Sequence, residues 1–251
     1  MSNMLQKRIF TLKWLDKKIK PLPLFVALPD TGLVSLLTAA NIINQYKLPI
    51  AGYVDADWLP PMISILEGKP LSPVRLYVDE KILILISEVP IYPENWSNFS
   101  QVVLSIYDEL ALPLIIGATG LPNPKRHNLD KLRLFASYTD KSFKERYLKN
   151  VNDFSGLLAG PYASLLRSFL MREISAILLI VDSFPNYPDP EAAALVTDVI
   201  GRIVNKQFDV NILLKKASEI KLMARRLAAE TQRIRSAVST ETGRPPTSFY
   251  V

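Results

Sequence analysis

Short apolar runs alternate with longer amphipathic stretches along most of this chain. An apolar run that is bounded by glycine, proline or charged residues is typical of a buried strand. Such runs predict strands at Leu24–Leu28, Ile50–Val54, Val74–Val78, Ile82–Ile86, Leu112–Ile116, Lys131–Tyr138 and Ser175–Val181. The third and fourth runs are separated only by Asp79, Glu80 and Lys81, so we expect them to form a hairpin.

The amphipathic stretches between these runs predict helices. They cover Leu33–Tyr46, Glu94–Leu110, Phe154–Met171 and a stretch from Asp189-Pro190 to about Lys206. The third is interrupted early by Gly156 and by Gly160-Pro161. Asp189 suits the N-cap of the last helix and Pro190 suits its first turn. Strands separated by helices predict an α/β fold with a mostly parallel sheet and helices on both faces.

The segment 211–238 has the most regular spacing in the chain. Its apolar and small residues recur at alternating steps of four and three, as do the a and d positions of a heptad repeat. They are Leu213, Ala217, Ile220, Ala224, Leu227, Thr231, Ile234 and Val238. This stripe predicts a long C-terminal helix that packs against another subunit, against a helix of its own chain, or on its own sheet. The narrow stripe favours the contact between subunits, although its small and polar members would weaken a simple dimeric zipper.

These patterns divide the chain into four segments. Residues 1–20 form a basic N-terminal arm, residues 21–210 the α/β core domain, residues 211–238 the heptad helix and residues 239–251 a flexible tail. The tail contains Gly243 and the pair Pro245-Pro246, which neither a helix nor a central strand accommodates.

The tail ends in Phe249, Tyr250 and Val251. These residues present an apolar ring, a ring with a hydroxyl and a free carboxylate to solvent. Pockets on partner proteins can capture a C-terminal carboxylate. The ending therefore predicts a binding motif for another protein.

Composition narrows the class of protein. Of the 251 residues, 49% are hydrophobic and 22% are charged, which is typical of a globular domain. The chain has no cysteine, which excludes disulfides, thiolate metal sites and cysteine nucleophiles. It has no apolar run of membrane-spanning length, and residues 1–20 lack the apolar core of a signal peptide. We therefore expect a cytoplasmic protein without a membrane partner.

The net charge of +6 is concentrated at the two ends. Residues 1–20 contain six basic and one acidic residue, and residues 211–238 contain seven basic and two acidic residues. Each segment is therefore +5, and the rest of the chain is −4. Neither basic segment interleaves aromatic residues with its charges, so nucleic acid is not the expected partner.

The sequence offers little catalytic chemistry. The single histidine, His127, lies in a polar stretch, and without cysteine it cannot complete a usual zinc site. Gly117-Ala118-Thr119-Gly120 lacks the lysine and hydroxyl of a P-loop. Several carboxylates lie near predicted strand ends, where α/β sites form, but such residues are more often caps or loop anchors. They are Asp30, Asp55, Asp57, Glu88, Asp182 and Asp189. We predict no catalytic residue, no metal ligand and no cofactor.

Two resemblances sharpen this interpretation. The ending Phe249-Tyr250-Val251 resembles the hydrophobic-Tyr-X (HbYX) tail with which proteasome activators and some assembly chaperones dock between α-subunits of the core particle. From Leu22 to Met223 the chain resembles the proteasome assembly chaperone family, including its archaeal and bacterial members. The matching segments are Gly32-Leu33-Val34, Ala39 to Ile43, Ser72 to Tyr77, Ser87 to Ile91, Phe154 to Pro161 and Pro188 to Ala194. Leu121-Pro122-Asn123-Pro124 departs from the family, where a glycine-rich loop is usual.

The family resemblance implies a phosphorylase/hydrolase-like α/β fold, homo-oligomers in archaeal members and no established catalysis. The leading hypothesis is an ATP-independent proteasome assembly chaperone or activator-like protein that docks its tail into pockets of the α-ring. Two alternatives stay open. One is an enzyme of the nucleoside phosphorylase or hydrolase type, and the other is a basic nucleic-acid-binding scaffold protein.

Overall fold

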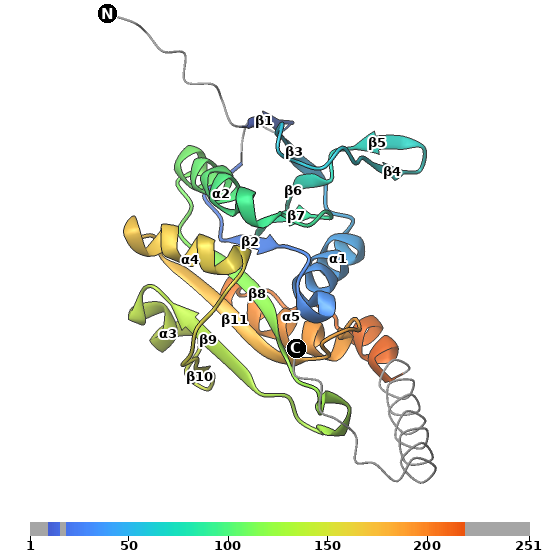
Figure 1. Cartoon of the computed structure of the whole chain (residues 1–251), viewed down its shortest axis with the longest axis vertical. Coiled ribbons are helices and arrows are strands. Elements are labelled where there is room, and N and C mark those ends of the chain that lie inside the picture. Colours follow the sequence, from blue (N-terminus) through green and yellow to red (C-terminus); the bar gives the residue numbers. More distant parts are fainter. Residues whose placement is uncertain (1–9, 16–18, 219–251) are drawn as a thin grey trace, which may run out of the picture.

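The computed structural model describes residues 10–15 and 19–218 (Figure 1). Its strands are β1 (Thr11–Trp14), β2 (Leu24–Ala27), β3 (Ile50–Asp55), β4 (Ser64–Leu66), β5 (Lys69–Leu71), β6 (Val74–Val78), β7 (Leu83–Ser87), β8 (Ile115–Pro122), β9 (Leu134–Tyr138), β10 (Asn152–Asp153) and β11 (Ala176–Ser183). Its helices are α1 (Val34–Tyr46), α2 (Trp96–Leu110), α3 (Lys141–Tyr147), α4 (Pro161–Met171) and α5 (Pro190–Val204). Short 3₁₀ helices are η1 (Thr31–Leu33), η2 (Pro93–Asn95) and η3 (Arg126–Asn128), and residues 211–218 are helical.

The main sheet is mixed, so the prediction of a mostly parallel sheet is wrong. Within the described residues it has nine strands in the order β1-β3-β6-β7-β2-β8-β11-β9-β10, and β4 pairs with β5 alone. The four central strands β7, β2, β8 and β11 are parallel, but β1, β3, β6 and β7 pair antiparallel, as do β11 and β9. The cause lies in the connections, because a parallel pair needs a crossover, usually a helix, and β6 reaches β7 through a tight turn.

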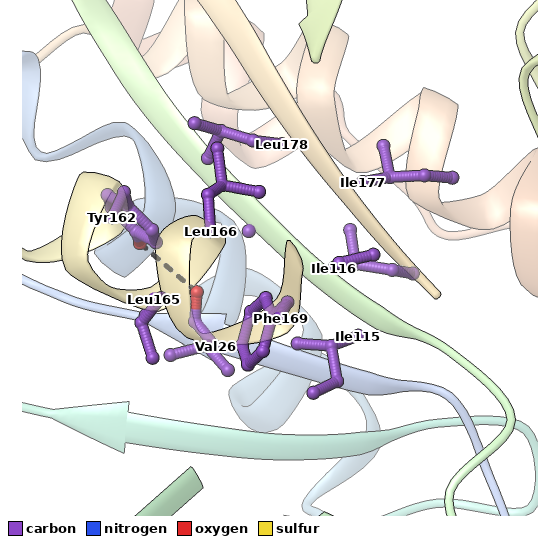
Figure 2. Close-up of a pocket in the computed structure, with 11 residues that line it drawn as sticks. Val26, Ile115, Ile116, Tyr162, Leu165, Leu166, Phe169, Ile177 and Leu178 are labelled. Carbon is purple, nitrogen blue, oxygen red and sulfur yellow. Dashed lines mark hydrogen bonds between the residues drawn. The ribbon is translucent and has the colours of Figure 1, made fainter. Parts of the chain in front are cut away.

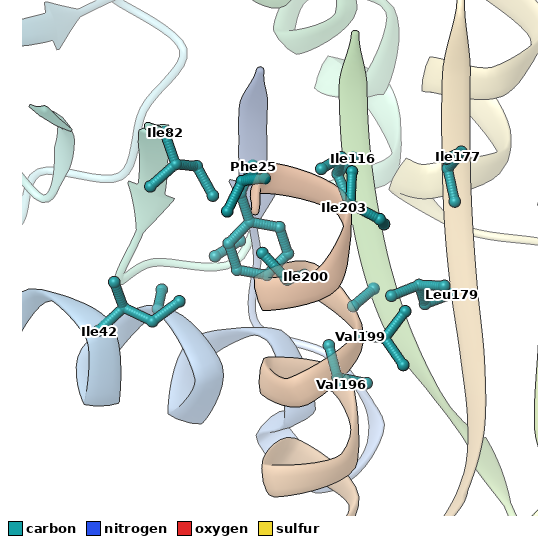
Figure 3. Close-up of a cluster of buried hydrophobic side chains, with 14 of the residues drawn as sticks. Phe25, Ile42, Ile82, Ile116, Ile177, Leu179, Val196, Val199, Ile200 and Ile203 are labelled. Carbon is teal, nitrogen blue, oxygen red and sulfur yellow. The ribbon is translucent and has the colours of Figure 1, made fainter. Parts of the chain in front are cut away.

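Helices cover both faces of the sheet, as the sequence predicts. On one face α1 and α5 pack on the sheet, and Figure 3 shows their buried side chains meeting those of β2, β8 and β11. On the other face α2 and α4 bury Phe99, Val102, Leu165 and Phe169 against the opposite sides of the same strands. Each such side chain, fully buried, stabilises the fold by about 1.5–3 kcal/mol. No described helix has both the length and the apolar character needed to span a bilayer.

Two predicted elements, the strand at Leu112–Ile116 and the helix from Phe154, have different bounds in the structure, and glycines lie at both differences. The run predicted at Leu112–Ile116 is instead β8, which continues through Gly117 and Gly120. The helix predicted from Phe154 begins only at Pro161, because Gly156 and Gly160 adopt φ angles of 159° and 103°. The sequence patterns did not predict β1, the hairpin β4–β5 or α3. The start of α5 is confirmed, because the Asp189 side chain accepts a hydrogen bond from the Ala192 N–H at 3.1 Å.

Candidate functional site

The strand-end carboxylates occupy separate surroundings. Glu88 accepts hydrogen bonds from Arg75 Nη1, at 3.0 Å, and from the Ser64 hydroxyl. Asp182 is buried and pairs with Arg133 Nε at 2.8 Å. Asp55 and Asp57 are exposed at the end of β3, whereas Asp30 and Asp189 lie at the carboxyl end of the parallel strands. Among the described residues, no group of three or more histidines and carboxylates is placed to hold a metal ion.

A buried ion cluster fixes the loop after β8 to the start of α5. Arg126 is fully buried, and its Nε and Nη2 donate to the two carboxylate oxygens of Asp189 at 2.7 and 3.0 Å. Nη2 also donates to Glu191 at 2.8 Å, and the guanidinium carbon lies 4.9 Å from the centre of the Phe184 ring. Burial opposes the charge on Arg126, but its hydrogen bonds to the carboxylates outweigh burial and raise the pKa of the guanidinium. Every carboxylate of this cluster has a partner, as expected of a structural anchor.

Asp30 follows β2 at the end of the sheet where the carboxyl ends of the parallel strands meet. Its carboxylate accepts hydrogen bonds from the Gly120 N–H at 3.1 Å and from the Ser35 hydroxyl at 3.4 Å. Burial nevertheless raises the pKa of the Asp30 carboxyl to about 8, because desolvation disfavours the charged form more than these bonds favour it. A carboxyl with this pKa could exchange protons near neutral pH.

The loop that carries Asp30 approaches two strands of the sheet closely. A Cβ added at Gly120 would lie 2.3 Å from the Thr31 carbonyl oxygen, and one added at Gly32 would lie 1.8 Å from the Ser183 hydroxyl oxygen. The loop after β2 therefore packs directly against β8 and β11. This packing leaves no room for a side chain at either glycine.

Replacing Asp30 with asparagine is expected to change how stability depends on pH. The folded protein keeps the Asp30 proton up to about pH 8, whereas the unfolded chain loses it near pH 3.8. This proton therefore favours folding fully at low pH, and its contribution is lost as the pH rises from about 4 to about 8. Urea unfolding of Asp30→Asn at pH 5, 6, 7 and 8 should show a flatter dependence than the native protein. Asp198→Asn, which alters an exposed carboxyl, should keep the native dependence, and parallel curves for Asp30→Asn would refute the assignment.

An apolar cavity lies between α4 and the strands β2, β8 and β11 (Figure 2). Tyr162 and Val26 line the cavity, and the Tyr162 hydroxyl donates a hydrogen bond to the Val26 carbonyl at 3.1 Å. The volume of the cavity is about 10 Å³, roughly what one water molecule requires, and the side chains that line it are apolar. The cavity is therefore a packing defect of the core and too small for a ligand.

The base of the C-terminal segment, residues 205–211, is tied closely to α1. Asn41 and Gln45, one turn apart on α1, donate to the Asp209 carbonyl at 2.9 and 3.2 Å, and the Asp209 N–H donates to Gln45 Oε1 at 3.1 Å. The Asp209 carboxylate accepts from the Asn211 N–H at 2.9 Å and so begins the next helix. These bonds fix where the C-terminal segment leaves the domain.

Three further contacts strengthen this base. Phe208 is buried and meets the Tyr46 ring edge-on, with 5.7 Å between the ring centres. Lys206 Nζ lies 2.6 Å from the carboxylate of Asp79 in the hairpin turn between β6 and β7. The Tyr46 hydroxyl also donates to the Gln207 carbonyl at 3.1 Å. The base is therefore attached to both α1 and the sheet.

The first two positions of the heptad stripe, Leu213 and Ala217, follow this base. Leu213 is buried in a cluster with Ala193 and Ala194 of α5, against which Leu37 and Val210 pack, and Ala217 is also buried. The stripe thus begins on its own domain. The remaining predicted site residues lie outside the described residues, and their roles stay predictions: Ile220, Ala224, Leu227, Thr231, Ile234, Val238, Phe249, Tyr250 and Val251.

Comparisons with known proteins agree with this architecture. A sequence model of the PAC2 family matches residues 24–228. An uncharacterised protein of Methanocaldococcus jannaschii is 25% identical over 205 residues, which are 81% of this chain and 84% of that protein.

Solved structures share the fold. PbaA of Pyrococcus furiosus, an archaeal homolog of proteasome-assembly chaperone, superposes with a TM-score of 0.76 at 22% identity, over 92% of this chain and 97% of PbaA. PbaB of the same organism, an archaeal proteasome activator, superposes with a TM-score of 0.73 at 18% identity, over 88% of this chain and 99% of PbaB. The mixed sheet and its helical layers are therefore common to these proteins.

Proposed function

Since this chain belongs to the PAC2 family, we propose that it is an ATP-independent partner of the proteasome core particle, acting as an assembly chaperone or an activator-like protein. The family match over residues 24–228 carries the proposal. Support comes from PbaA and PbaB, which share the fold and are an assembly-chaperone homolog and a proteasome activator.

In the proposed mechanism the last three residues dock into a pocket between α-subunits of the core particle. The Val251 carboxylate pairs with a basic residue of the pocket, in a charge-assisted contact. The Tyr250 ring fills an apolar slot while its hydroxyl bonds a polar group, and Phe249 buries further apolar surface. The base of the C-terminal segment supports this mechanism, because its bonds to α1 give the segment a defined origin on the domain.

Several tails acting together would make the binding tight. One three-residue tail buries little surface and should bind weakly. A homo-oligomer held together by the heptad stripe would present several tails, and each bound tail would raise the effective concentration of the next. We place this assembly in the cytoplasm together with the core particle.

Blocking the terminal carboxylate tests the mechanism. A few residues added after Val251 displace the carboxylate from its basic partner, so binding to the core particle from the same source should fall at least tenfold in surface plasmon resonance. The same residues added before Met1 are the matched control and should leave binding unchanged. Tyr250→Phe keeps the ring but loses the hydroxyl and should bind with intermediate affinity. Equal binding by the protein extended at its C-terminus would exclude the carboxylate mechanism.

A further inference from the structure

The hairpin β4–β5 exposes an apolar surface for which the described chain provides no cover. The hairpin pairs with no strand of the main sheet and projects from it beside β3 (Figure 1). Met62, Ile63, Ile65 and Leu66 are each 60–71% exposed. Four large apolar side chains exposed within five consecutive residues of a folded domain indicate a contact with another protein or segment. An isolated two-stranded hairpin is also only marginally stable in water, so a binding partner would stabilise it.

An acidic groove adjoins this apolar surface. The groove has a volume of about 400 Å³ and is lined by Leu59, Pro60, Pro61, Met62, Ile63 and Pro73 together with Asp55, Asp57 and Ala56. Both aspartates are exposed, and they form no ion pair within the described part of the chain. Residues 55–73 contain three acidic residues and one basic residue. We name the groove and the hairpin together the hairpin surface, residues 55–73. Its occupant should therefore combine apolar side chains with positive charge.

We propose that the hairpin surface binds the segment 219–238 of a second copy of this chain. That segment meets both requirements. The heptad stripe supplies apolar side chains, and the segment contains five basic and two acidic residues. Residues 1–9 are basic as well but carry no such stripe. Complementary charge and the presence of the heptad stripe therefore favour residues 219–238 over residues 1–9 as the occupant.

A second copy is the source because the base holds each chain's own segment elsewhere. Residues 211–218 pack through Leu213 on α5, and in Figure 1 they lie beyond α1 from the hairpin and point away from it. The helix that the heptad spacing predicts for residues 211–238 would continue in that direction, away from the hairpin of its own chain. Exchange of these segments between copies would build the oligomer. The inference rests on the proposed self-association through the stripe but does not depend on docking of the tail.

Disulfide trapping tests this contact directly, because the native chain has no cysteine. One full-length chain carries Ile65→Cys, and a second chain, distinguishable in mass, carries a cysteine at Ile220, Leu227 or Ile234. These three positions sample one stripe residue per heptad, which covers the possible registers. After mixing and mild oxidation, at least one pair should give a disulfide-linked species of both chains, at least tenfold above the control. The control replaces the hairpin cysteine with Lys149→Cys, on an exposed loop.

Charge reversal supplies a second measurement. Asp55→Lys with Asp57→Lys should reduce the trapped species severalfold, and adding Lys221→Glu with Arg225→Glu to the partner chain should restore it. Trapping no greater than the control in all three pairs would overturn the inference. Disulfides only between two Ile65→Cys chains would also overturn it. So would a disulfide formed within a single chain in a variant that carries Ile65→Cys and the stripe cysteine together. Binding of the core particle by the untrapped variants reports on tail docking separately, so the two proposals can fail independently.

Discussion

Replacing Arg126 with methionine is expected to lower the free energy of unfolding by about 3–5 kcal/mol, because the substitution leaves a buried carboxylate without its counter-charge. Arg126 is fully buried, and the Asp189 side chain that it contacts is 1% exposed. Asp189 also caps α5 and accepts from the Phe184 N–H at 3.2 Å, so its carboxylate cannot turn towards water without losing these bonds. The loop after β8 and the start of α5 should loosen together. Urea denaturation followed by circular dichroism measures the loss.

Two further variants identify the cause of this effect. Arg202→Met removes an exposed ion pair with Asp198 on α5 and should cost no more than about 0.5 kcal/mol. Arg126→Met combined with Asp189→Asn removes both buried charges and keeps an acceptor for the helix cap, so it should recover part of the stability. A loss for Arg126→Met as small as that for Arg202→Met would show that the cluster does not anchor the loop.

Replacing Gly120 with alanine is expected to cost about 1–3 kcal/mol or more, because the added methyl group meets backbone rather than a movable side chain. Its Cβ would lie 2.3 Å from the Thr31 carbonyl oxygen and 2.8 Å from the Ser183 Cβ. The loop after β2 would have to separate from β8. Separation of the loop would also expose Asp30 to water and remove the main cause of its raised pKa, so the pH dependence assigned to Asp30 should weaken in the same variant.

Gly68→Ala is the control for Gly120→Ala, because it replaces a glycine at a position where the added methyl group meets no other atom. Gly68 has a φ of 78° at the tip of the hairpin β4–β5, and an added Cβ there meets no atom within 4 Å. The free energy of unfolding of this variant should fall by only about 1 kcal/mol, the cost of placing alanine in a left-handed backbone conformation. Thermal unfolding that affects the two variants equally would show that Gly120 is not required for close packing.

Local chemistry explains which elements the sequence could predict. The start of α5 at Asp189-Pro190 follows from a side-chain cap and a fixed proline φ, and both act within one helical turn. The β6–β7 hairpin follows from two apolar runs joined by a few polar residues. In contrast, Gly117 and Gly120 resemble a loop in sequence but lie inside β8, because other segments approach the backbone closely there.

Long-range contacts explain what the sequence could not predict. The apolar runs indicate strands but not their directions, so the mixed sheet depended on connections that the pattern leaves open. Arg126 and Asp189 are 63 residues apart, and the Gln45–Asp209 contact spans 164 residues. Neither pairing has a local signal. The sequence predicted residues at the end of the chain as the candidate site, but it gave no signal for the contacts between residues 205–211 and α1.

The most direct test is the binding of the core particle, from the same source, to the native protein and to a version that lacks Phe249, Tyr250 and Val251. Binding is measured by analytical ultracentrifugation at equal concentrations, with circular dichroism to show that both proteins are folded. We predict that the native protein binds and that the shortened protein loses binding at least tenfold. Equal binding by both proteins, or binding by neither, would contradict the proposal that the tail docks this chain on the proteasome.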